Sequence, residues 1–425
     1  MNRIILIGNG FDLAHGLKTS YKHFIDDYWT KKIKSIRTVP NINEIKYEDI
    51  ANDITITMLP SFSLLLSNSF INYKTFKREV DRNMGDIVFN NKFLKKITNH
   101  LSLFNWVDVE IEYNKLLHDS IQYNDIEKVN EGFLIIKKAL EKYLHEIVKK
   151  NKQKCLNYKI LNKIYSNFKL KDFTEKGVKI FIEEECQKFI QLQNFKNKLT
   201  SQYLSEKTIY LLDFFKSYSI SYNSPHFKSE FYKLMLNEEN NYFNLLPKQI
   251  LFLNFNYTNI ENEYYEYDFF ENKTGGFKSE IGGIKKDVIH IHGELMNENN
   301  PMIFGYGDEI DDGYKMIEKT NDNRYLENVK SIKYLETDNY KNLLNFINSD
   351  NYQIFIFGHS CGISDRTLLN TLFEHENCVS IKFFYYKENG TDNYSDVVRN
   401  ISRNFTNKAI MREKVVNKMY CAPLL

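Results

Sequence analysis

The chain has 425 residues, of which 17 are glycine and 6 are proline, and 42% are hydrophobic. This composition excludes a linker-rich, low-complexity or disordered protein. Lysine and arginine number 57 against 55 aspartates and glutamates, so the formal net charge is +2 and the composition gives no support to nucleic-acid binding.

The five cysteines are scattered and form no Cys-x-x-Cys pair. We therefore expect neither a structural zinc site nor a disulfide framework, and the odd, sparse count suits a reducing cytoplasm. The apolar run Ile4–Ile7 is too short for a signal-peptide core, and no stretch approaches the ~20 apolar residues of a membrane span. We expect a cytoplasmic protein with no membrane partner.

Five short apolar runs bounded by turn residues predict buried strands of a parallel sheet. In chain order they are Ile4–Ile7, Ile250–Phe255, Val288–Ile291, Tyr352–Phe357 and Val379–Tyr386. A helical pattern at residues 368–373 precedes the fifth run. The first four runs lead into small or polar residues, and ligands of open α/β sheets bind at that carboxyl edge.

Residues 19–245 have a different pattern, with apolar residues at helical spacing among many lysines and glutamates. Three such segments are Tyr21–Ile36, Asp125–Asn151 and Gly177–Phe215. The predicted fold class is α/β, a Rossmann-like and mostly parallel sheet with a large helical insertion. We predict that residues 1–18 and 246–425 form the nucleotide-binding domain and that residues 19–245 form a mainly helical subdomain.

Most of the glycines cluster beside the predicted strand ends, and the first cluster is Gly8-Asn9-Gly10-Phe11-Asp12. A Gly-x-Gly turn after a strand can present backbone N–H groups to a phosphate or ribose. Leu13 stands where the dinucleotide fingerprint has its third glycine. The alternative is a tight turn in which Asp12 caps a helix.

The second motif, Asn254-Phe255-Asn256-Tyr257-Thr258, closes the second predicted strand. A carboxamide both donates and accepts hydrogen bonds, so Asn256 can hold a sugar hydroxyl or orient a water molecule. Asparagines are also common turn formers, which is the structural alternative.

The third motif is His290-Ile291-His292-Gly293-Glu294. Strand alternation predicts that His290 and His292 share one face of the sheet. His292 lies at the strand end, where a neutral imidazole of pKa near ~6.5 can act as a general base. A hydrogen-bonded core histidine is the alternative. The motif offers no third ligand at a metal-like spacing, so we expect no metal.

The fourth motif is Gly358-His359-Ser360-Cys361-Gly362, with Asp365 beyond it. A strand, a polar turn and a helix start predict a turn that binds phosphate or ribose. The motif also matches the Gly-x-Ser-x-Gly nucleophile elbow, but His375 is the one histidine that follows Ser360. A serine hydrolase, a cysteine nucleophile and a plain capped turn are the alternatives.

A fifth motif, Trp106-x-Asp108-x-Glu110-x-Glu112, places alternating acids beside one of the two tryptophans. Acids at a helix start, favoured by the helix dipole, explain it structurally. The functional alternative is a nuclease that uses Asp12, Glu294, Asp108 and Glu110 with a divalent metal.

Some of these motifs resemble a known family. The opening segment is Asn9-Gly10-Phe11-Asp12-Leu13-Ala14-His15-Gly16-Leu17-Lys18-Thr19-Ser20-Tyr21. It resembles the opening signature of the AbiH family, bacterial proteins linked to phage abortive infection. The Trp106/Asp108/Glu110 group and the Gly358-His359-Ser360…Asp365 turn also look like those of that family. The resemblance spans the chain and implies a function in phage defence.

The order of the four strand-end motifs is also similar to that of sirtuin-like NAD-binding proteins of phage defence. This likeness implies that Asn256 positions the sugar or a water molecule and that His292 is the base. Asn9 and Asp12 replace the usual alanine and serine of the first glycine loop. The zinc-binding cysteine pairs of protein deacylases are missing, which argues against a deacylase.

We therefore predict an abortive-infection effector that binds NAD or a related nucleotide and hydrolyses its N-glycosidic bond without a metal. The predicted catalytic residues are Asn256, His292 and Asp12, with Asp12 stabilising the sugar cation or holding the ribose. The predicted binding residues are Gly8, Asn9, Gly10, Phe11, Tyr257, Gly293, Gly358, His359, Ser360 and Asp365. We expect a homo-oligomer or a partner defence protein. The alternative from another class is a non-catalytic nucleotide-sensing or oligomerising module.

Overall fold

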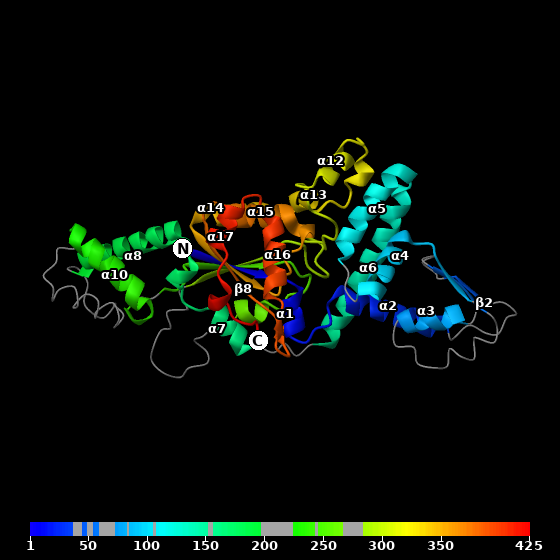
Figure 1. Cartoon of the computed structure of the whole chain (residues 1–425), viewed down its shortest axis with the longest axis horizontal. Coiled ribbons are helices and arrows are strands. Elements are labelled where there is room, and N and C mark those ends of the chain that lie inside the picture. Colours follow the sequence, from blue (N-terminus) through cyan, green and yellow to red (C-terminus); the bar gives the residue numbers. More distant parts are fainter. Residues whose placement is uncertain are drawn as a thin grey trace.

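A central parallel sheet organises the chain (Figure 1). The computed structural model describes residues 1–36, 45–48, 54–58, 73–82, 85–104, 108–151, 156–196, 224–242, 245–266 and 284–425. The strand order is β6-β5-β1-β7-β8, and all neighbouring strands run parallel. Their bounds are β1 Asn2–Ile7, β5 Gln249–Asn254, β6 Lys285–His290, β7 Tyr352–Phe357 and β8 Cys378–Phe384. The α/β fold class and the five predicted strands are confirmed.

Helices cover both faces of this sheet, which is why its strands are nearly continuous apolar runs. One face packs against α14 (Asn339–Ser349), α15 (Arg366–Glu374), α16 (Tyr394–Asn404) and α17 (Lys408–Lys414). The other face packs against α1 (Asn9–Ala14), α7 (Tyr158–Ile164) and α11 (Asn262–Tyr265). The helix predicted from residues 368–373 is α15. In the chain, α15 lies between β7 and β8 and forms the helical crossover connection that two parallel strands require.

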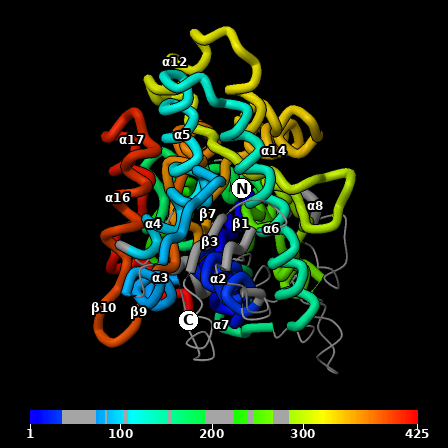
Figure 2. The backbone as a smooth tube through the Cα atoms, turned by 90° about the vertical axis from the view of Figure 1, so that its right-hand side faces the viewer, coloured from blue at the N-terminus to red at the C-terminus, as the bar shows by residue number. Residues whose placement is uncertain are grey.

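A second core lies at one end of the molecule (Figure 1, right). It is built by α2 (Tyr21–Ile36), α3 (Tyr73–Arg82), α4 (Lys92–Phe104), α5 (Val109–Tyr123) and α6 (Ile126–Lys150). Figure 2, viewed from that end, shows these helices in front of the sheet. The helices predicted from Tyr21–Ile36 and Asp125–Asn151 are α2 and α6. The same region holds an antiparallel sheet that the sequence analysis did not predict: β2 (Ile45–Glu48), β3 (Ile54–Met58) and β4 (Asp86–Phe89).

A third core lies at the opposite end (Figure 1, left). Helices α8 (Glu175–Lys196) and α10 (Pro225–Tyr242) build it together with η3 (Leu170–Asp172). The predicted helix Gly177–Phe215 is α8 as far as Lys196, and its remainder lies outside the described residues. The described helices of residues 19–245 therefore lie at both ends of the sheet, except α7, which covers one face. The predicted division into two domains stays a prediction.

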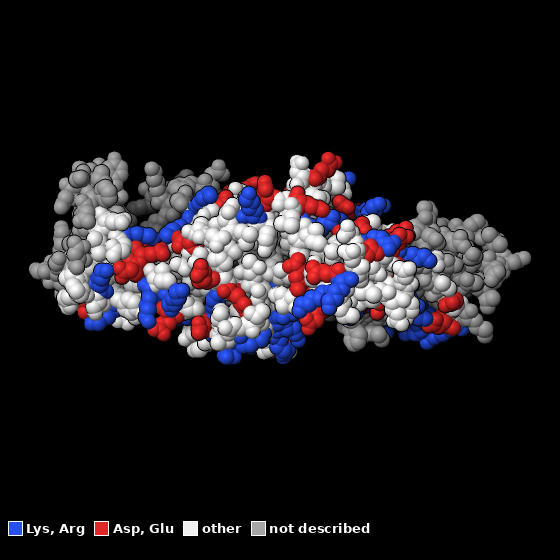
Figure 3. Space-filling view, turned by 90° about the horizontal axis from the view of Figure 1, so that it is seen from above, with Lys and Arg blue, Asp and Glu red and all other residues white. Residues whose placement is uncertain are grey.

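The remaining elements are short. They are α12 Asp312–Glu318, η6 Asn323–Tyr325, α13 Lys330–Lys333, η7 Tyr334–Glu336, η8 Ile363–Asp365, β9 Lys387–Glu388, β10 Thr391–Asp392 and η9 Lys418–Tyr420. Charges of both signs intermingle on the face shown in Figure 3, in line with the small net charge. Within the described part of the chain, no helix is long and apolar enough to cross a membrane.

Candidate functional site

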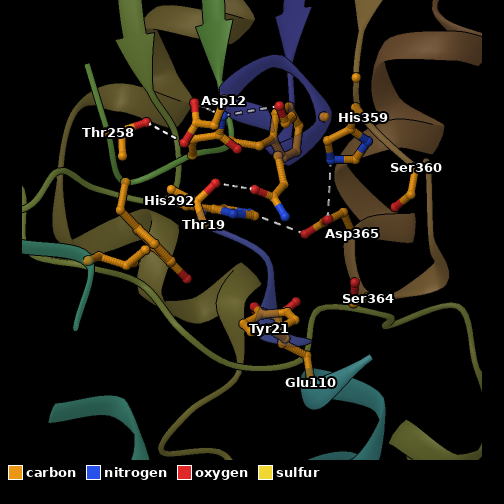
Figure 4. Close-up of a pocket in the computed structure, with 18 of the residues that line it drawn as sticks. Asp12, Thr19, Tyr21, Glu110, Thr258, His292, His359, Ser360, Ser364 and Asp365 are labelled. Atoms are coloured by element: carbon orange, nitrogen blue, oxygen red, sulfur yellow. Dashed lines mark hydrogen bonds and ion pairs between the residues drawn. The ribbon is translucent and has the colours of Figure 1, made fainter. Parts of the chain in front are cut away.

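The carboxyl ends of β1, β5 and β7 meet at a cavity of about 290 Å³, called the pocket below (Figure 4). β1 has β5 on one side and β7 on the other, so the pocket lies where the strand order reverses. The predicted site residues that line it are Gly8, Asn9, Gly10, Asp12, Asn256, Tyr257, His292, Gly358, His359, Ser360 and Asp365. The structure thus brings these residues together, and their roles stay predictions.

Two predicted binding residues lie elsewhere. Phe11 is fully buried and packs against the rings of Tyr264 and Phe357. Gly293 turns the chain after β6 with φ +81°, and a Cβ there would lie 2.1 Å from the carbonyl oxygen of Pro301. Neither residue lines the pocket.

The glycine turn after β1 packs against the turn after β7. The Gly8 N–H donates to the Phe357 carbonyl at 3.1 Å and the Gly10 N–H donates to the Gly358 carbonyl at 2.8 Å. A Cβ on Gly10 would lie 2.8 Å from the Gly358 Cα, so these glycines permit the close approach of two protein segments. The prediction that these N–H groups face a phosphate is therefore wrong for Gly8 and Gly10.

Asp12 belongs to a buried hydrogen-bond network. Gly8 is the N-cap of α1, so the alternative in which Asp12 caps this helix is also wrong. The Asp12 carboxylate accepts hydrogen bonds from Asn256 Nδ2 at 2.8 Å and from Thr258 Oγ1 at 2.7 Å. Its exposed fraction is 1%, and burial raises its pKa to about 7.

Asn256 is held from both sides by this network. Its Nδ2 group donates to Asp12 and to the Gly8 carbonyl, and its backbone N–H donates to Asn254 Oδ1 at 2.8 Å. Among the described residues, none donates a hydrogen bond to its Oδ1. In the pocket Asn256 is therefore an acceptor, although its sequence context allowed both roles.

The two histidines of the third motif have different partners. β6 ends at His290, and the Gly293 N–H donates to the His290 carbonyl, so the strand alternation does not reach His292. His290 Nε2 lies 2.8 Å from Glu261 Oε1, and neither residue lines the pocket. The prediction that both rings share one face of a strand therefore fails, because the backbone turns between them.

His292 and Asp365 form a buried pair (Figure 4). His292 Nε2 lies 3.1 Å from Asp365 Oδ1 and 3.0 Å from the Tyr334 hydroxyl. Burial, followed by the charge of Lys330, lowers the pKa of His292 to about 4, so the imidazole is neutral at pH 7. Its other nitrogen, Nδ1, has no hydrogen-bond partner among the described residues.

Asp365 is the centre of a larger charge cluster. His359 Nε2 lies 3.6 Å from Asp365 Oδ2, on the other side from His292 (Figure 4). Lys330 Nζ donates to Asp365 Oδ1 at 2.7 Å and to Glu110 Oε2 at 2.6 Å. Burial raises the pKa of Asp365, but Lys330 and His292 outweigh it and hold the pKa well below its usual range.

The helical region supplies acids to the pocket. Asp108 is the N-cap of α5 and accepts the Ile111 N–H at 3.1 Å, and Glu110 lies in the first turn. Asp108 and Glu110 both line the pocket. The fifth motif is therefore the start of a helix, and two of its acids also lie at the candidate site. Glu112 turns away to His100 and Lys115, and Trp106 lies outside the described residues.

The nucleophile alternatives lack the geometry they need. Ser360 lines the pocket after β7, whereas His375 precedes β8 and so lies at the opposite edge of the sheet. Cys361 is fully buried with φ +54°, and burial raises the pKa of its thiol. Its N–H donates to His359 Nδ1 at 3.0 Å, so this strained residue orients His359.

The metal-dependent alternative finds no cluster to support it. In the described ranges, no group of three or more His, Cys, Asp or Glu side chains could hold a metal ion. Glu294 bonds to Asn259 and Asn297 and does not line the pocket. Asp12 and Glu110 each have the partners named above.

Three residues near the pocket are not among the predicted site residues: Lys330, Tyr334 and Glu261. Glu261 is fully buried and accepts a hydrogen bond from Asn254 Nδ2 at 2.6 Å, which fixes the asparagine that holds Asn256. Lys330 and Tyr334 lie in α13 and η7, where the sequence carries neither glycine nor a strand end as a signal.

Comparisons with known proteins converge on one family. A family model described as bacteriophage abortive infection AbiH matches residues 4–387. No curated protein and no solved structure matches the chain.

Proposed function

Because the chain belongs to the AbiH family of bacteriophage abortive infection proteins, we propose that it acts in phage defence by hydrolysing the N-glycosidic bond of NAD or a related nucleotide in the pocket. The finer part of this proposal rests on the chemistry of the pocket. The likeness to sirtuin-like NAD-binding proteins remains a prediction.

One observation carries the proposal: a buried, neutral imidazole paired with a carboxylate in a cavity at the carboxyl edge of the sheet. Asp365 accepts from His292 Nε2, which fixes the ring tautomer with its proton on that nitrogen. The lone pair then lies on Nδ1, which has no partner among the described residues. This is the arrangement of a general base held by an acid.

The reaction uses few groups. The C1′–N bond breaks, the base leaves with the electron pair, and positive charge develops on the ribose. A water molecule then bonds to C1′ and gives its proton to His292 Nδ1, a base contribution typically worth ~10²–10⁴-fold. Asn256 Oδ1 accepts a hydrogen bond from that water or from a sugar hydroxyl, and the nearby carboxylate of Asp365 stabilises the developing cation.

The pocket recognises the ligand mainly through the hydroxyl groups of its ribose. The N–H groups of Gly8 and Gly10 already bond to protein carbonyls, so they do not hold a pyrophosphate. Hydroxyl and carboxamide groups of Ser360 and Asn256 line the same cavity and suit sugar hydroxyls.

The test is an NAD assay with the full-length protein in phage-infected cell extract and in buffer, followed by chromatography of released nicotinamide. We expect cleavage by the wild type, loss of cleavage in His292→Ala and Asn256→Ala, and normal cleavage in the control His226→Ala, whose side chain is exposed on α10. Intact NAD together with no NAD binding by calorimetry would overturn the proposal. Phage protection that survives both pocket variants would favour the non-catalytic sensing module.

A further inference from the structure

We propose that Lys330 and Glu110 form a charge clamp that keeps His292 neutral, which makes Glu110 a positioning residue supplied to the site by the helical region. This inference rests on the proposed function, in which His292 is the base. The two residues lie 220 positions apart in the chain, and their side chains meet at the back of the pocket.

The clamp works through one shared oxygen atom. Asp365 Oδ1 lies 2.7 Å from Lys330 Nζ and 3.1 Å from His292 Nε2, so the cation and the imidazole compete for the same acceptor. A buried carboxylate beside a histidine on its own favours the charged imidazolium. Lys330, and not a protonated His292, supplies the positive charge that balances Asp365. The histidine can therefore stay neutral.

Lys330 is also bonded to a second acid, Glu110, whose pKa burial raises to about 8 against the opposing charge of Lys330. The Lys330 side chain is 0% exposed, and burial alone lowers the pKa of a lysine. Asp365 and Glu110 outweigh that burial and raise the pKa of Lys330, so it stays charged. Glu110 Oε2 accepts from Nζ at 2.6 Å, which also fixes the ammonium group between the two carboxylates.

The other groups facing His292 do not replace this charge. They are Asp365, His359 and the hydroxyl of Tyr334. His359 Nδ1 accepts the Cys361 N–H, which leaves the His359 proton on the Nε2 that faces Asp365. Burial raises the pKa of Tyr334 well above its usual value, so its hydroxyl is neutral. Lys330 is therefore the group whose removal changes the charge around His292.

The decisive variant is Lys330→Met/Glu110→Gln, which removes both titratable groups of the clamp with side chains of similar shape. The matched control is Lys382→Met/Asp172→Asn, which removes another buried lysine–carboxylate pair, 2.7 Å apart, on a different part of the sheet. Lys330→Arg keeps the positive charge and tests rescue. Lys330→Gln is the second variant for the case that the double variant does not fold.

The readout is the protonation midpoint of His292, followed by NMR of labelled histidine without substrate. We expect a midpoint about 1–3 pH units higher in the clamp variants, and an unchanged midpoint in the control and in Lys330→Arg. The low-pH limb of kcat/KM on NAD should move to higher pH by the same amount, so activity at pH 6 falls by up to ~10-fold and recovers at higher pH.

Failure of this inference and failure of the proposed function give different results. An unchanged protonation midpoint of His292 in both Lys330→Gln and the double variant overturns the clamp, whether or not NAD is cleaved. A midpoint that moves in a protein that leaves NAD intact supports the clamp and removes the proposed reaction instead.

Discussion

Two regions of the sheet bury charged side chains, and they do so in opposite ways. The first is the pocket. The second is a buried row on the sheet face beneath α7 and η3, formed by Arg3, Gln353, Ser380, Lys382 and Asp172. In the row, Arg3 donates to the carbonyls of Ile164 and Ser166 and its guanidinium lies over the rings of Phe168 and Phe355.

The difference lies in where the remaining polar atoms point. Lys382 Nζ donates to Asp172 Oδ2, and Gln353 links Arg3 to Ser380. Arg3 Nε and Asp172 Oδ1 are buried with no hydrogen-bond partner among the described residues, but the row lines none of the described cavities. In the pocket, Asn256 Oδ1 and His292 Nδ1 have no partner among the described residues, and both residues line the cavity. Buried charge therefore holds the structure together in the row, whereas the same kind of residues in the pocket are prepared for a ligand. Each prediction below tests that contrast.

The largest effect is expected in the pocket. His292→Ala should lower kcat on NAD by ~10²–10⁴-fold, because the reaction loses its base, while the thermal midpoint changes little. Rates and melting curves measured on the same preparation check this. A variant that unfolds, or one that keeps its rate, would place His292 with the structural residues of the row.

In the row, the expected effect is on stability. Lys382→Met alone removes the cation that is hydrogen-bonded to Asp172, leaves Arg3 as the remaining cation that interacts with it, and should cost up to about 3–5 kcal/mol of unfolding free energy. The double variant Lys382→Met/Asp172→Asn should recover part of this loss, because the lysine and aspartate charges disappear together while buried Arg3 loses the charge of Asp172. Urea titration gives the free energies, and the rate per folded molecule should match the wild type in both. A fall in that rate would contradict a purely structural row.

Asp12 should make stability depend on pH. Its pKa of about 7 in the folded protein lies above the value of 3.8 in the unfolded chain, so the native state holds the extra proton between these values. Its stabilising contribution is complete below pH 4 and is lost as the pH rises through 7. Between pH 5 and pH 8 the wild type should lose about 3 kcal/mol from this group, and Asp12→Asn should lose none of it. Urea titrations at both pH values test this, with the exposed Asp312→Asn as a control.

The features that could be predicted from the sequence are those that depend on residues close together in the chain. The five strands are apolar runs closed by glycine or polar residues, and parallel strands end at one edge, which is why Asn256, His292 and Asp365 could be placed together in advance. Lys330 could not, because its burial depends on Glu110 and Asp365 from distant segments. The role of Gly10 was misjudged for the same reason: whether a glycine faces a ligand or another turn depends on what lies opposite.

The smallest effect is expected for Ser360, and it separates binding from nucleophilic attack. No described histidine is placed to activate its hydroxyl, since His359 Nδ1 is engaged by Cys361 and His375 lies at the other edge of the sheet. Ser360→Ala should therefore remove one hydrogen bond to the ribose, raising KM about 2–10-fold with kcat unchanged. Steady-state kinetics on NAD measure both constants, and a fluorophosphonate probe should leave the wild type unlabelled. A collapse of kcat together with labelling of Ser360 would show that this turn is a nucleophile elbow after all, and the base would then have to be sought outside the His292–Asp365 pair.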